Sequence, residues 1–183
     1  MYTFMSPSGM EEVESTAKVA DWLQSGLQSL LPDNTTPNIL TYEPNSFNIS
    51  IPVTVIGTGL GSESKGIIMQ CPCAPKKFNH EEFFNECKLP RAHFNAKDYG
   101  HKDMLDDDPS GLIGKVADNM CVNGKGPRDP MRRCVGGILV AFLNYYFQDN
   151  KVDFDAIVNE PSVAPVVLDQ VQFDTTIDQK ISN

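Results

Sequence analysis

One short run of β-branched residues constrains the fold of this chain more than any other feature. Residues 51–57, "IPVTVIG", are almost all apolar and end in a glycine. A strand with one solvated face alternates polar and apolar residues, whereas a strand covered on both faces is apolar throughout. The run therefore predicts a buried strand of a parallel sheet, with helices on both faces.

Other segments continue this alternation of helix and strand. Apolar spacing predicts an amphipathic helix over 10–31 and a buried helix over 129–148, which contains the longest apolar run, 134–143. Three weaker segments complete the prediction: a short helix over 79–87, a second strand over 92–99 and an extended edge in the tail 159–173. The order of elements predicts an α/β domain with a mostly parallel sheet flanked by helices.

Charge and hydropathy exclude several partners. The 183 residues carry a net charge of -9, which argues against nucleic acid and against an anionic membrane surface, because both require clustered Lys and Arg. No apolar run reaches the roughly 18 residues of a membrane span. The start, "MYTFMSPSGMEEVES", resembles neither a signal peptide nor an Arg-rich transit peptide.

The five cysteines do not indicate a disulfide scaffold or a zinc site. Their number is odd, no C-x-x-C pair is present, and Cys71-Pro-Cys73 is too tight for the usual zinc spacing. We expect no metal and no cofactor, and we expect most cysteines to be free or to form one local bridge.

A histidine is the leading candidate for chemistry. His101 follows the second predicted strand, and ligands of open α/β sheets lie beyond the carboxyl ends of the strands. A neutral imidazole there suits general-base work, although a loop histidine with local hydrogen bonds is the alternative. His80, at the start of a short helix, and His93, within a predicted strand, have weaker claims.

Two motifs near the strand ends have simpler interpretations. "GTGLGS", 57–62, lacks the last glycine and the helix of a dinucleotide-binding fingerprint, so we expect a flexible turn. The acidic run supplies four carboxylates but not the spacing of a calcium loop, which favours a solvated acidic loop. Its members are Asp103, Asp106, Asp107 and Asp108.

Longer strings carry a family resemblance. "VTVIGTGLG", "CPCAP", "NHEEFF", "KDYGHKDMLDDDPSG", "NGKGPRDPMRRCVGGILVAFL" and "EPSVAPVVL" closely resemble plant chlorophyllases, in the same order and spacing from about Thr41 to Phe173. The resemblance implies an α/β-hydrolase that cleaves the phytyl ester of chlorophyll through a Ser-Asp-His triad. It also implies a chlorophyll-like porphyrin ester as ligand and a chloroplast location, with cytosol or endomembrane as alternatives.

The resemblance assigns one triad member and leaves two without a counterpart. His101 matches the family's catalytic histidine in its "YGH" string. The family's serine lies in a G-H-S-R-G-G elbow, and this chain has neither that string nor any G-x-S-x-G. The nearest string is Ser62-Glu63-Ser64-Lys65-Gly66, and the "DPV"-type string of the family's aspartate is also missing.

The missing strings locate a join in the chain. The helix ending in "LLP" leads into the serine strand in the family, but here it meets a later segment near residues 34–40. We therefore expect residues 1–183 to form a single partial α/β-hydrolase domain without its central strands, inactive alone and prone to self-association through exposed apolar faces. The alternative is a truncated or spliced form that binds pigment or a full-length partner without catalysis.

Overall fold

The computed structural model describes residues 40–64, 72–105 and 121–175. The predicted helix 10–31, residues 34–39 of the predicted join, Cys71 and Asp106 to Asp108 lie outside these residues.

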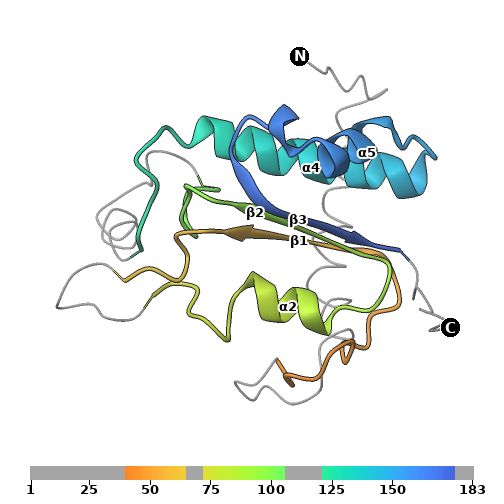
Figure 1. The fold of residues 1–183 in the computed structure, drawn as a ribbon, viewed down its shortest axis with the longest axis horizontal. Coiled ribbons are helices and arrows are strands. Elements are labelled where there is room, and N and C mark those ends of the chain that lie inside the picture. The colour runs from red at the N-terminus through yellow and green to blue at the C-terminus, as the bar shows by residue number, and fades with distance from the viewer. Residues whose placement is uncertain (1–39, 65–71, 106–120, 176–183) are drawn as a thin grey trace, which may run out of the picture. The chain divides into compact units, whose positions relative to one another are not determined.

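Three strands form one mixed sheet in the order β1-β2-β3 (Figure 1). β1 (Val53–Thr58) pairs in parallel with β2 (Arg91–Ala96), and β2 pairs antiparallel with β3 (Leu168–Asp174). Both predicted strands are confirmed, and the tail does form an extended edge. The parallel pair matches the predicted sheet, while β3 makes the described sheet mixed.

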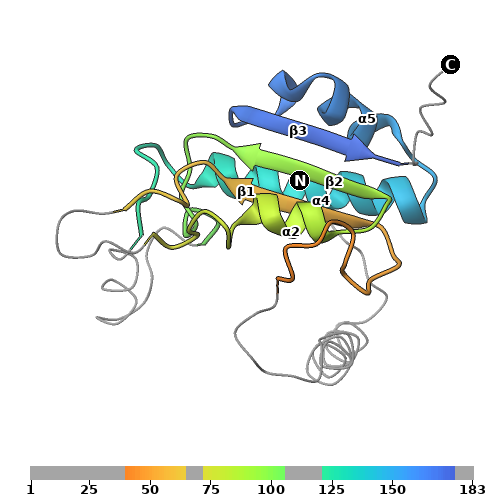
Figure 2. The same ribbon diagram turned by 60° about the horizontal axis from the view of Figure 1, so that its bottom comes forward.

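Helices cover both faces of this sheet (Figures 1 and 2). α4 (Asp129–Phe147) and α5 (Val152–Asn159) lie on one face, and α2 (His80–Glu86) lies on the other. The Asn79 side chain caps α2 by accepting a hydrogen bond from the Glu81 amide. α2 and α4 confirm the predicted helices. α5, which the sequence did not predict, is only 8 residues long and buries just two side chains, Phe154 and Ile157.

The core lies between β2 and the helices α4 and α5. Ala92, Phe94 and Ala96 point to this side from β2, and each is 0% exposed. Phe154 of α5 meets the Phe94 ring edge-on at 5.9 Å and the Phe173 ring at 5.0 Å. The packing of the Phe154 ring against the rings of β2 and β3 therefore holds α5 on the sheet.

Two elements that we predicted as buried are only partly covered. Val53 to Ile56 of β1 are half-buried rather than enclosed, because the only strand beside β1 in the described part of the chain is β2. The outer face of α4, defined as Gly136, Gly137, Leu139, Val140, Leu143 and Phe147, is exposed. A Cβ added at Gly136 or Gly137 would meet nothing within 4 Å. The prediction of full burial was wrong for both elements in this structure.

These exposed surfaces agree with an incomplete α/β-hydrolase fold. A helix that is apolar all round is normally buried in the core of a larger domain, and a free strand edge presents unpaired backbone groups. β1 and the outer face of α4 therefore have the sequences of covered elements, but residues 40–64, 72–105 and 121–175 do not supply neighbours that cover them.

Candidate functional site

The carboxyl ends of the two parallel strands lie side by side. Thr58 of β1 is in register with Ala96 of β2. Beyond them, the Gly59 amide donates to the Ala96 carbonyl at 2.9 Å and the Leu60 amide donates to the Tyr99 carbonyl at 3.0 Å. A Cβ at Gly59 would lie 2.2 Å from the Lys97 carbonyl oxygen. Glycine is thus needed where the two loops touch, and residues 59–62 form a turn, as expected, rather than a nucleotide-binding helix.

His101 lies in a turn shortly after the end of β2. Its side chain is exposed. The backbone around it is fixed, since the Asp103 amide donates to the Gly100 carbonyl at 3.0 Å. An exposed imidazole on a fixed turn at this end of the sheet can exchange protons with a bound reactant.

Asp103 fixes this turn from inside. Its carboxylate is 1% exposed and accepts from the amides of Gly100 at 2.7 Å and Gly124 at 2.6 Å. The Arg128 guanidinium adds an ion pair at 3.1 Å. The prediction of a solvated acidic loop was therefore wrong for Asp103, because the carboxylate is buried and satisfied by two amides and one cation. No signal in the sequence distinguished it from its acidic neighbours.

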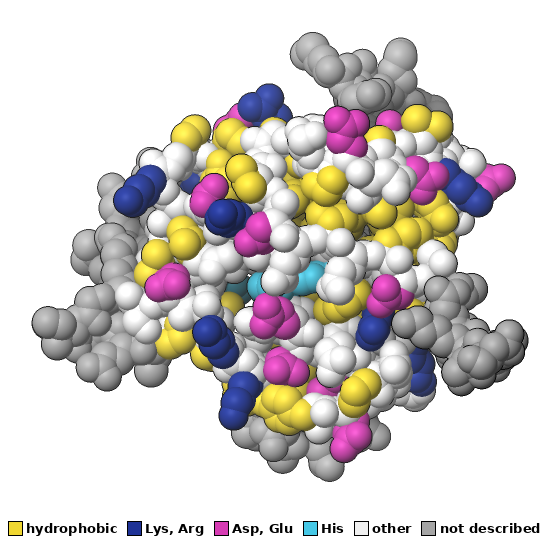
Figure 3. Space-filling view, viewed as in Figure 1, with side chains coloured by type: hydrophobic (Ala, Val, Ile, Leu, Met, Phe, Trp, Pro, Cys, Tyr) yellow, Lys and Arg dark blue, Asp and Glu magenta, His cyan; other side chains and the backbone are white. Residues whose placement is uncertain are grey.

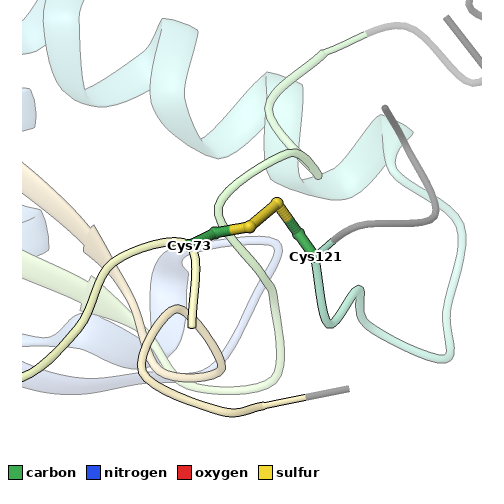
Figure 4. The surroundings of a disulfide bond; sticks show 2 residues. All are labelled: Cys73 and Cys121. Carbon is green, nitrogen blue, oxygen red and sulfur yellow. A yellow bond between two sulfur atoms is a disulfide. The ribbon is translucent and has the colours of Figure 1, made fainter. Parts of the chain in front are cut away.

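A disulfide joins the two loops of this region (Figure 4). Cys73, after β1, bonds to Cys121, which precedes α4, across 48 residues. The described cysteines form one bridge, as the expectation allowed, but the bridge is not local, because the tertiary fold brings distant loops together. Cys87 and Cys134 are free and buried, and burial raises the pKa of the Cys134 thiol to about 11.

The other two histidines form a structural pair on the α2 side of the sheet. His80 Nδ1 lies 2.7 Å from His93 Nε2, and the two rings stack with centroids 4.9 Å apart. Gly57 leaves room for this pair, since a Cβ there would lie 2.2 Å from the His80 ring. Burial lowers the pKa of His93 to about 4 and also lowers the pKa of His80. His93 is buried and His80 is half-buried, and burial favours the neutral form of both imidazoles.

A polar hollow of about 600 Å³ borders His93 between α2 and β3. Figure 3 shows histidine side chains in the middle of this face, with acidic side chains around them. Glu81, Asp169 and Asp174 line the hollow, together with Arg91. Within the described residues, no group of three or more His, Cys, Asp or Glu side chains is arranged to hold a metal ion.

A second, larger hollow of about 880 Å³ borders the loop that carries His101. Its lining is mainly apolar and comes from the turn after β1, the loop after β2 and the segment before β3. The residues include Leu60, Tyr99, Pro161, Val166 and Leu168, with Asp98, Lys125 and Ser162 as the polar members. Tyr99 is fixed by its hydroxyl, which donates to the Pro127 carbonyl at 3.2 Å.

Comparison with known proteins gives the family. The family model described as Chlorophyllase matches residues 33–175, which is most of the chain and includes every described element. The chain belongs to the chlorophyllase family. The resemblance drawn from the sequence is thereby confirmed, and with it the α/β-hydrolase fold class.

Individual chlorophyllases match at moderate to high identity. Chlorophyllase-1, chloroplastic, from Citrus unshiu is 41% identical over 222 residues, covering 94% of this chain and 66% of its own length. Chlorophyllase-1 from Arabidopsis thaliana is 53% identical over 135 residues, covering 74% of this chain and 41% of its own length. The chain thus spans slightly less than two thirds of the citrus relative and less of the Arabidopsis one.

Two described residues bear on the partners that the resemblance implies for His101. Ser62, in the string nearest to an elbow, is half-buried in the turn after β1, and the residues that follow it up to Ser64 are not helical. Asp103 accepts hydrogen bonds from Gly100, Gly124 and Arg128.

None of the described helices is long and apolar enough to cross a membrane.

Proposed function

We propose that the chlorophyllase to which this sequence belongs hydrolyses the phytyl ester of chlorophyll, giving chlorophyllide and phytol, with His101 as its general base. One observation carries this assignment. His101 is exposed on a turn beyond the carboxyl ends of two parallel strands, and the buried Asp103 carboxylate holds that turn from within. Reactive groups of α/β folds lie at this end of the sheet.

The role of His101 follows from the chemistry of ester cleavage. An imidazole nitrogen removes the proton of a serine hydroxyl as the oxygen attacks the ester carbon, and the same proton then goes to the leaving alcohol. An acid on the other ring nitrogen fixes the tautomer. His101 has neither partner in this sequence, so we propose that the chain as written does not turn over chlorophyll. Losing the nucleophile of a serine hydrolase costs about a millionfold in turnover.

The alignments support an internal gap as the cause. The citrus alignment spans 222 residues, whereas 94% of this 183-residue chain is about 172 residues. About 50 positions of the relative therefore face no residue of this chain. The Arabidopsis alignment covers 135 residues, equal to 74% of this chain, and leaves no room for a gap of that size. We place the gap near residues 34–40, where the family strings break, which makes residues 1–183 one partial domain.

The names of relatives support a compartment and a ligand. The citrus proteins are named chloroplastic, and we propose the same compartment for the complete protein. The ligand is chlorophyll or a related porphyrin ester, in keeping with the mainly apolar hollow beside the His101 loop.

Restoring the gap tests the proposal. The chain as written and a version with the citrus segment inserted between Asn34 and Leu40 are assayed for chlorophyllide release. We expect no release from the first and measurable release from the second, abolished by His101→Ala. Lys97→Ala, an exposed change on the same loop, serves as the matched control and should leave the rate unchanged. Release from the chain as written, lost in His101→Ala, would overturn the assignment of the missing groups.

A second candidate is a non-catalytic form that binds a partner. Two features favour it: β1 has a strand on only one side within the described part of the chain, and the outer face of α4 exposes apolar side chains. Sequencing the transcript across residues 34–40 separates the two. A message that carries the elbow supports the enzyme, and a message with the short join supports the binding form.

A further inference from the structure

One face of β2 carries only polar side chains. Arg91, His93 and Asn95 alternate along the strand, and His93 contacts α2, so all three face the α2 side of the sheet. A buried strand normally presents apolar residues to the helix that covers it, so a polar row of this kind requires an explanation. The residues in register with them on β3 are also polar: Asp174, Gln172 and Gln170.

Hydrogen bonds within the fold account for only part of this row. Arg91 pairs with Asp174 at 3.0 Å, and the Asn95 side-chain nitrogen donates to Asp169 at 2.8 Å. Two further atoms, His93 Nδ1 and Asn95 Oδ1, are buried and have no hydrogen-bond partner among the described residues. An unpaired buried polar atom is costly, and a ligand that hydrogen-bonds to it is favoured by the same amount.

The contact with His80 decides which hydrogen-bonding role His93 Nδ1 has. His80 Nδ1 and His93 Nε2 lie 2.7 Å apart, so one of these two nitrogens carries the proton that they share. Among backbone groups, buried unpaired N–H donors are rarer than under-satisfied acceptors. The same preference in the imidazole puts the proton on His93 Nε2 and leaves Nδ1 as a lone-pair acceptor.

Carboxylates surround the hollow that the His93 ring borders. This polar hollow of about 600 Å³ is lined by His93, which is only 1% exposed, and by Glu81 and Asp169. Figure 3 shows histidine side chains in the middle of this face, with acidic side chains around them. Arg91 pairs with Asp174, whereas neither Glu81 nor Asp169 has an ion pair in the described part of the chain. The hollow thus combines uncompensated negative charge with a buried hydrogen-bond acceptor.

We propose that this hollow binds a small organic cation with N–H donors, such as a primary ammonium. The carboxylates of Glu81 and Asp169 balance its charge, and one of its N–H groups donates to His93 Nδ1. A hollow of this volume suits a small molecule. A metal ion fits less well, because the described residues include no group of three His, Cys, Asp or Glu side chains that could hold one.

The proposed site is separate from the proposed ester hydrolysis. Its lining comes from α2, β2 and β3, and it shares no lining residue with the hollow beside the His101 loop. β3 and β1 lie at opposite edges of the described sheet, so the site is on the side of β2 away from β1. Cation binding can therefore be measured on the chain as written, whether or not that chain acts on chlorophyll.

Heteronuclear NMR of the histidine ring nitrogens tests the proposal on the full chain at neutral pH. Titration with butylammonium chloride should shift the His93 Nδ1 resonance and leave the ring nitrogens of exposed His101 unchanged. Two probes of similar size separate the contributions. Butyltrimethylammonium has the charge without N–H donors, and butanol has a donor without the charge. Each should bind at least about tenfold more weakly than butylammonium.

Variants of the two carboxylates test the charge contribution. Glu81→Gln and Asp169→Asn change exposed side chains and should each raise the Kd of butylammonium about threefold, and the double variant about tenfold. Asp153→Asn, an exposed change on α5 at the other face of the sheet, is the matched control and should leave the Kd unchanged.

Three results would overturn the proposal. An unchanged His93 Nδ1 resonance at saturating butylammonium would show that water alone satisfies this atom. Equal affinities for butylammonium, butyltrimethylammonium and butanol would show that only the apolar chain is bound. An unchanged Kd in the Glu81→Gln/Asp169→Asn double variant would show that the cation binds elsewhere.

Discussion

The two parallel strands have burial opposite to their composition. β1, "VTVIGT", is apolar and only half-buried along its first four residues. β2, "RAHFNA", has three residues with polar side chains and is buried from its second residue to its last. The difference comes from neighbours, because β2 lies between two strands and β1 is bordered by β2 alone in the described part of the chain. The apolar composition of β1 is typical of a strand that is more enclosed than β1 is by the described residues.

β2 accommodates its polar side chains through hydrogen bonds. Arg91 donates to the carbonyls of Phe84, Asn85 and Cys87 at 3.0 Å each and pairs with Asp174. Asn95 donates to Asp169 at 2.8 Å. Hydrogen bonds of this kind lower the cost of burying polar groups, although Asn95 Oδ1 and His93 Nδ1 are buried without a partner among the described residues. Composition alone therefore predicts the wrong order of burial for the two strands. It also fails to distinguish the two faces of α4, which are both apolar but unequally covered.

We expect the largest effect on stability from a substitution in the core side of β2. Phe94→Ala removes a side chain that is 0% exposed and should cost about 3–5 kcal/mol of unfolding free energy. Val55→Ala, on half-buried β1, should cost about 1 kcal/mol or less. Urea unfolding measures both. Equal losses of unfolding free energy would contradict the difference in burial between the strands. A larger loss for Val55→Ala after the citrus segment is restored would show that this segment covers β1.

Asp103→Asn should have the next largest effect. The change keeps the shape but removes the negative charge of a buried ion pair, in which the Arg128 guanidinium lies 3.1 Å from the Asp103 carboxylate, and should cost about 3 kcal/mol. Asp98→Asn, on the exposed part of the same loop, is the matched control and should be neutral. Thermal unfolding of the two variants side by side decides this. A neutral Asp103→Asn would show that backbone contacts alone fix the turn.

Acid should weaken the β2 side of the fold through His93. Its pKa falls from 6.5 to about 4 on folding, so the unfolded chain binds a proton between these values that the folded chain does not. Stability is therefore fully present above pH 6.5 and is lost as pH falls toward 4, by up to about 3 kcal/mol. Unfolding free energies at several pH values measure the slope. His93→Gln should flatten it and exposed His101→Ala should keep it, and the reverse result would refute the assignment.

The smallest expected effect on stability is on the outer face of α4. Val140→Ala and Leu143→Ala, at 58% and 50% exposure, should each change stability by less than about 0.5 kcal/mol while reducing self-association. Ile138→Ala, on the inner face at 0% exposure, should cost about 2–5 kcal/mol. Denaturation and sedimentation together test the pair. A costly Leu143→Ala in the monomer would mean that the outer face is already covered.

The sequence by itself determined the local elements and the family. Apolar runs with defined ends predicted β1, β2, α2 and α4, and the string "KDYGHKDMLDDD" placed His101 after a strand. These features depend on residues close together along the chain, where turn, cap and strand preferences act. The short helix α5 was not predicted, because two buried apolar residues in 8 positions do not make a recognisable helical pattern.

Only the tertiary structure decided which groups are buried and what they contact. Asp103 is buried through contacts with Gly124 and Arg128, more than 20 residues away. The Cys73–Cys121 bridge spans 48 residues, and the neutral His80–His93 pair depends on α2 folding over β2. Burial and pairing of this kind depend on which distant segments become neighbours in space. Local sequence patterns do not encode that choice. They therefore could not predict that, in the described part of the chain, the apolar strand β1 lies at the edge of the sheet and the more polar strand β2 lies inside it.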